Sequence, residues 1–77
     1  MEIKILGTGC PKCQKLEQVV REFTQKNNIN CTIDKVQNID EILNYGVIAT
    51  PALVVNQKVA ISGRIPSNSE LENILKN

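Results

Sequence analysis

The sequence predicts an α/β fold in which three helices cover a four-stranded mixed sheet, and three observations support this. Segments with strand-like patterns alternate with segments of helical period, in the order βαβαββα. The first helix links two strands, and such a crossover makes the two strands parallel. Two residues separate the last two strand segments, as in an antiparallel hairpin. We therefore expect a three-layer α/β sandwich, formed by residues 1–77 as a single domain.

The first strand and helix have the clearest patterns. Residues 2–6 form a strand with Ile3 and Ile5 on one face. A helix begins at Pro11, whose fixed φ and missing N–H suit the first helical position, and ends near Lys26 before two asparagines. Its apolar stripe consists of Cys13, Leu16, Val19, Val20 and Phe23. We expect the opposite, solvated face to carry Lys12, Lys15, Glu17, Gln18, Arg21 and Glu22.

The middle of the chain predicts a second strand and a short helix. Residues 29–34 alternate between apolar and polar side chains, so a strand should point Ile29, Cys31 and Ile33 inward. Asn38 or Asp40 can cap the helix that follows, and Gly46 can close it. The apolar side of this helix would be Ile39, Ile42 and Leu43.

The last third predicts a hairpin and a final helix. The apolar run of residues 52–55 is typical of a strand buried on both faces, and Asn56-Gln57 would be its turn. Residues 58–62 alternate, with Val59 and Ile61 expected inward. Ser67 and Glu70 have the spacing of a capping box. The core stripe of the last helix would be Leu71, Ile74 and Leu75.

Composition argues against several functions. Net charge is +1, and one Phe, one Tyr and no Trp are present, so we expect no nucleic-acid partner. No apolar run approaches the length of a membrane span, so we expect no membrane partner, and the N-terminus does not read as a signal peptide. Three cysteines do not fit a secreted scaffold held by disulfides, which predicts a cytoplasmic protein.

The segment Cys10-Pro11-Lys12-Cys13 is the main candidate site. Cys10 would lie at a helix N-terminus, where unpaired N–H groups and the helix dipole favour a thiolate. We therefore expect Cys10 to be exposed and to attack disulfides as the nucleophile. Cys13, one turn further on and more buried, would be the resolving thiol. Lys12 supplies a nearby cation that would lower the pKa of the thiol further.

Metal binding is the alternative for this pair of thiols. Structural zinc needs four ligands, and the chain has no His and only one further cysteine, Cys31. A complete Cys/His site cannot be built within one chain, so we expect no metal and no cofactor. A soft metal such as Cu(I) would still suit two thiolates. We expect Cys31 to act as a small core hydrophobe.

Thr50-Pro51 is the second candidate segment. Proline is accepted at the first residue of a strand, so it could form a simple rigid turn. It could also hold a cis peptide bond beside the cysteines, with the Thr50 backbone pairing with an extended substrate. Local sequence leaves the isomer open, because only about 5–6% of X–Pro bonds in folded proteins are cis.

These motifs together resemble the thioredoxin superfamily, in a minimal form close in size to glutaredoxins. Residues 45–53, Tyr-Gly-Val-Ile-Ala-Thr-Pro-Ala-Leu, are similar to the thioredoxin segment Tyr-Gly-Ile-x-x-(Ile/Thr)-Pro-Thr-Leu, which carries the cis-proline. Residues 54–58 resemble its Asn-Gly-Lys hairpin, and Gly63 occupies the place of the glycine after the last strand. The resemblance covers nearly the whole chain and is greatest to the very small redox-active disulfide proteins of prokaryotes.

The resemblance implies a small dithiol–disulfide oxidoreductase. Cys10 would be the nucleophile, Cys13 would resolve the mixed disulfide, and a cis Pro51 would face the pair. The partners would be protein disulfide substrates and an upstream dithiol reductase. Gly9 stands where thioredoxin has Trp, and its buried acid has no evident counterpart in the first strand. The glutaredoxin Gly-Gly pair is reduced to Ser62-Gly63-Arg64, which puts glutathione as a partner in doubt.

A copper or mercury carrier is the competing class. Such carriers also place Gly-x-x-Cys-x-x-Cys after a first strand, as in residues 7–13. They run βαββαβ, however, and usually have Met two residues before the first Cys, where this chain has Thr8. A dimer sharing an iron–sulfur cluster is a third possibility without specific support.

Overall fold

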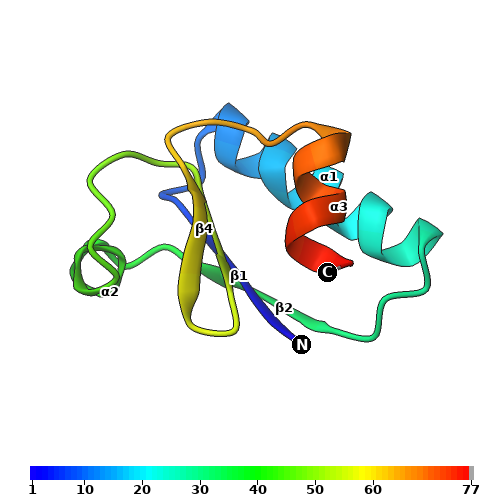
Figure 1. The fold of residues 1–77 in the computed structure, drawn as a ribbon. Coiled ribbons are helices and arrows are strands. Elements are labelled where there is room, and N and C mark those ends of the chain that lie inside the picture. Colours follow the sequence, from blue (N-terminus) through cyan, green and yellow to red (C-terminus); the bar gives the residue numbers. More distant parts are fainter. Residues whose placement is uncertain (77) are drawn as a thin grey trace.

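Within residues 1–76, which the structure describes, the computed structural model has four strands and three helices in the predicted order (Figure 1). Four of these elements have the predicted bounds or lie within a residue of them: β1 (Glu2–Leu6), α1 (Pro11–Lys26), β3 (Ala52–Val55) and β4 (Lys58–Ser62). The others are β2 (Thr32–Val36), α2 (Ile39–Asn44) and α3 (Asn68–Leu75). The predicted α/β class and element order are therefore confirmed.

The sheet is mixed, with strand order β2-β1-β3-β4. The central strand β1 pairs parallel with β2 and antiparallel with β3, and β3 and β4 form the hairpin. Asn56 and Gln57 make the hairpin turn with φ of 50° and 72°, the left-handed region that such tight turns require. The parallel pair follows from the helical crossover through α1, as predicted.

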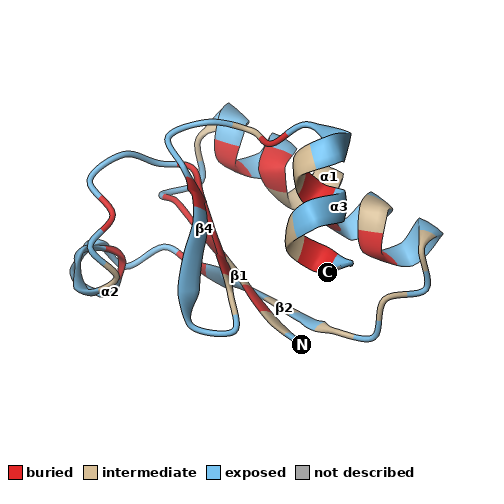
Figure 2. Ribbon diagram, in the orientation of Figure 1, coloured by how far each residue is buried: buried red, intermediate tan, exposed pale blue. Residues whose placement is uncertain are grey.

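Helices lie on both faces of the sheet. α1 and α3 cover one face, and the short α2 lies on the other (Figure 1). Each face has its own apolar core, and the buried residues of α1 and α3 face the sheet (Figure 2). The core under α1 and α3 consists of Ile3, Ile5, Leu16, Val20, Leu53, Ile61, Leu71 and Leu75. The core beside α2 consists of Leu6, Val36, Ile42, Val47, Ala52 and Val54.

The second strand lies later in the chain than predicted. β2 covers Thr32–Val36 rather than residues 29–34, because its parallel register with β1 pairs Glu2 with Thr32 and Leu6 with Val36. Residues before Thr32 have no partner residue on β1. Cys31 packs against the core under α1 and α3 but is only half-buried, since β2 is an edge strand.

Two predicted apolar faces were partly wrong. In α2 only Ile42 is buried, whereas Ile39 and Leu43 are 61% and 55% exposed. In β4, Ile61 is buried but Val59 is 40% exposed. The reason in β4 is a register shift: Leu53 pairs with Ile61 and the next residue of β3 pairs with Val59, so Val59 and Ile61 face opposite sides.

The last helix begins as predicted. The Ser67 hydroxyl accepts a hydrogen bond from the Glu70 N–H at 3.3 Å, and the Glu70 carboxylate accepts one from the Ser67 N–H at 3.0 Å. Arg64 forms an ion pair with the same carboxylate, which ties the loop after β4 to α3. No helix within residues 1–76 combines the length and apolarity needed to cross a lipid bilayer.

Candidate active site

The loop between β1 and α1 places both thiols of the motif at the start of the helix. Cys10 is the N-cap of α1, with extended backbone (φ −68°, ψ 164°), and Pro11 is in the first turn. Gly9 reverses the chain between strand and helix with φ of 91°, a conformation that side chains disfavour. The Cys10 carbonyl accepts the first helical hydrogen bond, from the Gln14 N–H at 3.0 Å. The sulfur of Cys10 is thereby held at the free N–H groups of the first turn.

The surroundings of Cys10 favour its thiolate. Its Sγ accepts a hydrogen bond from the backbone N–H of Cys13 at 3.3 Å. The pKa of Cys10 is lowered, first by a hydrogen bond from the Cys13 thiol and then by the backbone N–H groups of Cys13 and Lys12. Cys10 is half-buried rather than fully exposed.

Cys13 differs from Cys10 in both burial and acidity. It is only 5% exposed. Burial raises the pKa of Cys13, and the hydrogen bond with Cys10 raises it further. Its sulfur packs against the backbone of Gly7: a Cβ built on Gly7 would overlap the Cys13 Sγ and lie 2.9 Å from its Cβ. The two thiols are therefore unequal: the pKa of Cys10 at the helix N-cap is lowered, and the pKa of the buried Cys13 is raised.

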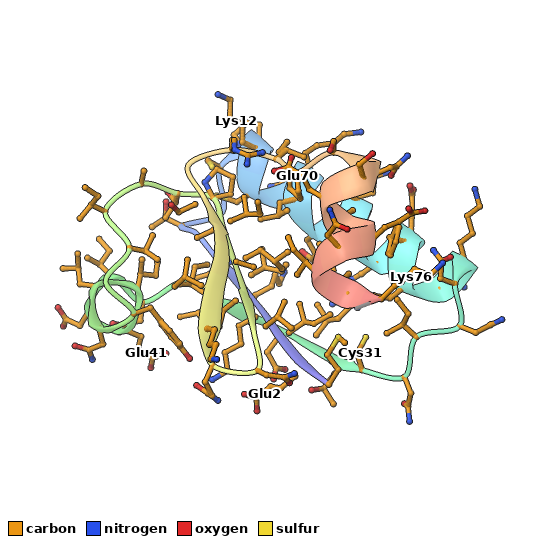
Figure 3. All side chains as sticks on the ribbon, in the orientation of Figure 1. Glu2, Lys12, Cys31, Glu41, Glu70 and Lys76 are labelled. Carbon is orange, nitrogen blue, oxygen red and sulfur yellow. The ribbon has the colours of Figure 1, made fainter. Side chains whose placement is uncertain are left out.

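Lys12 is exposed, and its side chain extends away from the protein into solvent (Figure 3). The backbone N–H of Lys12 contributes to the lowered pKa of Cys10. The structure thus gives the main chain of Lys12 a direct part in the environment of Cys10, whereas its ammonium lies in solvent.

Thr50 and Pro51 lie at the same end of the sheet as the thiols. Ala52 pairs with Leu6, so the residues before β3 run beside the loop that follows β1. The Thr50–Pro51 peptide bond is cis. Pro51 is buried, and its carbonyl accepts a hydrogen bond from the Gly63 N–H at 2.8 Å. Thr50 is exposed, and its backbone N–H and carbonyl have no hydrogen-bond partner within residues 1–76.

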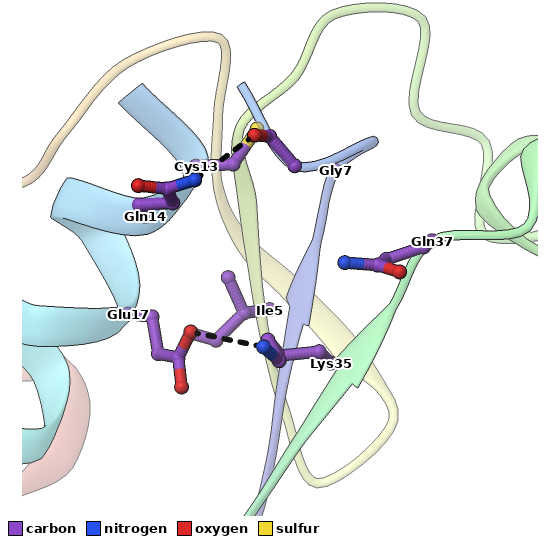
Figure 4. Close-up of a pocket in the computed structure, with 8 residues that line it drawn as sticks. Ile5, Gly7, Cys13, Gln14, Glu17, Lys35 and Gln37 are labelled. Atoms are coloured by element: carbon purple, nitrogen blue, oxygen red, sulfur yellow. Dashed lines mark hydrogen bonds and ion pairs between the residues drawn. The ribbon is translucent and has the colours of Figure 1, made fainter. Parts of the chain in front are cut away.

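A small cavity beside Cys13 is lined by residues that the sequence did not indicate as part of a site. Its volume is about 70 Å³, and Gln14, Glu17, Lys35 and Gln37 contribute to its lining (Figure 4). Glu17 pairs with Arg21 at 2.9 Å and with Lys35 of β2 at 3.6 Å. The sequence had predicted a purely solvated position for Glu17, and these contacts show that it is partly enclosed between α1 and β2. Its i,i+4 spacing from both Cys13 and Arg21 was the available signal. Gln14 had none, because its partner is a backbone carbonyl.

A structural zinc site would need more donors than the two sulfurs. Among residues 1–76, no group of three or more His, Cys, Asp or Glu side chains is placed to hold a metal ion. The observed element order is also βαβαββα rather than the βαββαβ of the copper carriers.

Comparisons with known proteins agree with the motifs. A family model described as a thioredoxin domain matches residues 1–76. A thioredoxin of Methanothermobacter thermautotrophicus is 40% identical over 75 residues, which is 97% of this chain and 97% of that protein. A thioredoxin of Methanocaldococcus jannaschii is 35% identical over 96% of this chain and 85% of its own length. A probable thioredoxin of Archaeoglobus fulgidus is 33% identical over 87% of this chain.

Proposed function

We propose, because this chain belongs to the thioredoxin family, that it exchanges disulfides with other proteins through Cys10 and Cys13. A thioredoxin-like oxidoreductase is the activity class that the family match and the thioredoxin relatives support. The residues and steps given below are the proposal itself. The observation that carries it is the inequality of the two thiols, one activated at the helix N-cap and one buried beside it.

The reaction has two steps. The Cys10 thiolate attacks one sulfur of a partner disulfide, forming a mixed disulfide and releasing the partner's other sulfur as a thiolate. The Cys13 thiol then loses its proton to solvent and attacks the Cys10 Sγ. The Cys10–Cys13 bond forms, the bond to the partner breaks, and the partner leaves as a dithiol. The partner disulfide is reduced by two electrons, and this chain is oxidised to its disulfide.

The structure suggests how the partner's backbone would be held. Thr50 offers an N–H and a carbonyl without partners at the sheet end where Cys10 lies. An extended segment flanking the partner disulfide could pair with them as a short antiparallel strand. Thr50 and Pro51 are therefore assigned to substrate binding, and the buried ring of Pro51 holds Thr50 in place.

The same proposal names the class of partner and the compartment. Substrates would be proteins with accessible disulfides, and an upstream dithiol reductase would return the Cys10–Cys13 disulfide to thiols. The odd, low cysteine count supports a cytoplasmic location.

Alkylation measured against pH tests the role of Cys10. We expect iodoacetamide to label Cys10 with an apparent pKa below the ordinary thiol value of about 8.5. Cys13 should react only at higher pH, and mass spectrometry of the digested protein separates the two sites. A Cys10 that titrates like a free cysteine would contradict the proposal.

Trapping of a mixed disulfide tests the separate roles of Cys10 and Cys13. Cys13→Ser should accumulate a mixed disulfide on Cys10 with a disulfide-bonded protein, whereas Cys10→Ser should accumulate none.

The metal content of protein purified without oxygen tests the competing hypothesis of a metal carrier. Copper or zinc at one equivalent, bound by the two thiols, would favour a carrier instead.

A further inference from the structure

Gln14 holds the backbone on both sides of Cys10, the proposed nucleophile. Its backbone N–H donates a hydrogen bond to the Cys10 carbonyl at 3.0 Å, as the first bond of α1. Its side-chain Nε2 donates a second hydrogen bond, at 3.3 Å, to the Gly9 carbonyl, and Figure 4 shows this bond as the dashed line from Gln14. The first bond would form in any helix that begins here, whereas the second requires a donor on the side chain of residue 14.

Gly9 gives the backbone before Cys10 considerable freedom. It has φ of 91° and no side chain, and glycine adopts many conformations at little cost. Among the described residues, only the Gln37 Nε2 would lie within 4 Å of a Cβ added to Gly9, at 3.8 Å, so close packing does not confine this residue. The peptide group is planar, so the Gly9 carbonyl and the Cys10 N–H turn together. The Gln14 side chain, by holding that carbonyl, therefore fixes the peptide plane from which Cys10 extends.

The direction of this peptide plane affects where the Cys10 sulfur points. Cys10 has φ of −68° and ψ of 164°, and with these angles its Sγ accepts a hydrogen bond from the Cys13 N–H at 3.3 Å. A hydrogen bond weakens steeply as its angle departs from linearity. A turn of the Gly9–Cys10 peptide group would move the Cys10 Cβ and take the sulfur out of line with the donor. The bond from Gln14 to Gly9 thus supports the bond from the Cys13 N–H to the sulfur.

We propose that Gln14 is a positioning residue of the exchange site, because its side chain holds the Gly9–Cys10 peptide group and thereby keeps the Cys10 Sγ on the Cys13 N–H. The inference rests on the proposed exchange reaction and adds a residue to its first step. In that step the Cys10 thiolate bonds to one sulfur of the partner disulfide, the S–S bond breaks, and the other sulfur leaves as a thiolate with the electron pair. Gln14 acts through the backbone of Cys10 and takes no part in these bond changes.

Three substitutions separate the side-chain bond from other effects. Methionine at position 14 is neutral, similar in length and a good helix former, but has no N–H to donate. Gln14 is exposed, so Gln14→Met leaves the core intact. Gln14→Asn keeps the amide but shortens its reach. Gln18→Met is the matched control, because Gln18 is also exposed, lies one turn further along α1 and donates to Glu22 at 3.2 Å.

The charges around Cys10 are the same in all of these proteins. The loop after β1 and residues 46–51 contribute no charged side chain. The charged and titratable groups of the other elements at this end of the sheet are Lys12, Cys13 and Glu17 of α1, Lys35 of β2, and Arg64 after β4 with its partner Glu70 of α3. A change in the titration of Cys10 therefore reports the lost hydrogen bond.

Two measurements follow the Cys10 thiolate, with Cys31→Ser in every protein so that the third thiol does not contribute. The first is the rate of labelling of Cys10 by iodoacetamide against pH, read by mass spectrometry of the digested protein. The second is the NMR shift of the Cys13 amide proton over the same pH range, because this proton is the one donated to the Cys10 sulfur. Exchange itself is followed with dithiobis(nitrobenzoate), from which Cys10 releases one thionitrobenzoate and Cys13 then releases a second.

In Gln14→Met and Gln14→Asn we expect the alkylation pKa of Cys10 to rise by about half a unit, which is a roughly threefold slower labelling below that pKa. The first release of thionitrobenzoate should slow by the same factor. Above the pKa the rates should converge with those of the parent, because the thiolate is then fully formed. The titration of the Cys13 amide proton should move to higher pH and become smaller. Gln18→Met should match the parent throughout.

Two kinds of result would overturn the role of Gln14 and leave the exchange reaction standing. One is a parent-like pKa and Cys13 amide titration in both position-14 variants. The other is labelling slowed equally at all pH values, which would report altered access to the sulfur. A parent protein that releases fewer than two thionitrobenzoates would overturn the exchange reaction itself, and the role of Gln14 with it.

Discussion

Replacing Gly7 by alanine should destabilise the protein, because the missing side chain of Gly7 makes room for Cys13. The new Cβ would overlap the Cys13 Sγ and lie 2.9 Å from the Cys13 Cβ. Gly7 is not among the residues with positive φ, so alanine is conformationally allowed and the cost is steric. Overpacking a buried site costs about 1–3 kcal/mol. Alanine also restricts the unfolded chain more than glycine does, which offsets about 0.4–1 kcal/mol of that cost. The expected net loss is about 1–2 kcal/mol.

Urea unfolding of the reduced protein, followed by circular dichroism, measures that loss. In thermal unfolding the same loss lowers the Tm by roughly 5–15 °C for a chain of this size. A double-mutant cycle identifies the cause. In a Cys13→Ala background the overlap with sulfur is gone, so the cost of Gly7→Ala should fall by about 1 kcal/mol, as expected for two residues in contact.

Gly46→Ala is the matched control for this cycle. Gly46 has φ of 79° and no atom within 4 Å of an added Cβ, so alanine there costs backbone strain and no overlap. Its cost should be the same with and without the Cys13 sulfur. The reasoning is refuted if Gly7→Ala is as stable as the parent, or if the cost of Gly7→Ala is the same with and without Cys13→Ala.

Three further predictions test other parts of the molecule. Lys12→Ala should move the alkylation pKa of the nucleophilic thiol by less than about half a unit, since a charge in solvent is strongly screened; a larger shift would restore a tuning role to the ammonium. Ile61→Ala should cost about 2–4 kcal/mol of unfolding free energy and Val59→Ala less than about 1 kcal/mol, because only Ile61 is buried; equal costs in urea would contradict the register shift. The pKa of Glu70 is lowered to about 2, first by its hydrogen bond with an arginine, so its stabilising effect is present above its ordinary pKa of 4.5 and is lost as pH falls toward 2. Glu70→Gln should therefore lose less Tm than the parent between pH 4.5 and 2, and identical curves would rule this out.

Much of the fold could be predicted because its signals are local. The proline at the start of α1, the capping box of α3 and the apolar run of β3 each act within a few residues, and each predicted element was found. β2 was misplaced because its bounds depend on β1, which supplies its hydrogen-bond partners from about thirty residues away. Val59 was misassigned because a register shift leaves no trace in an alternating pattern.

Some features of the candidate site could likewise be predicted from the sequence, and others could not. The spacing of Cys10 and Cys13 and the dipeptide Thr50-Pro51 pointed to the chemistry from sequence alone. The packing of Gly7 against the Cys13 sulfur did not, since any glycine before a helix would suggest only a turn. Nor did the bond from Gln14 to the Gly9 carbonyl, because a glutamine in a first helical turn is ordinarily solvated.

The sequence by itself determined the order of the elements, the position of two thiols at a helix start and the family to which the protein belongs. Periodicity, capping and residue spacing encode these features, and they act over short stretches of chain. Only the tertiary structure decided which backbone groups surround the buried sulfur and which residues line the cavity beside it. Those properties arise where β1, α1 and β2 meet, and burial and hydrogen bonding there depend on atoms that are distant in sequence and adjacent in space.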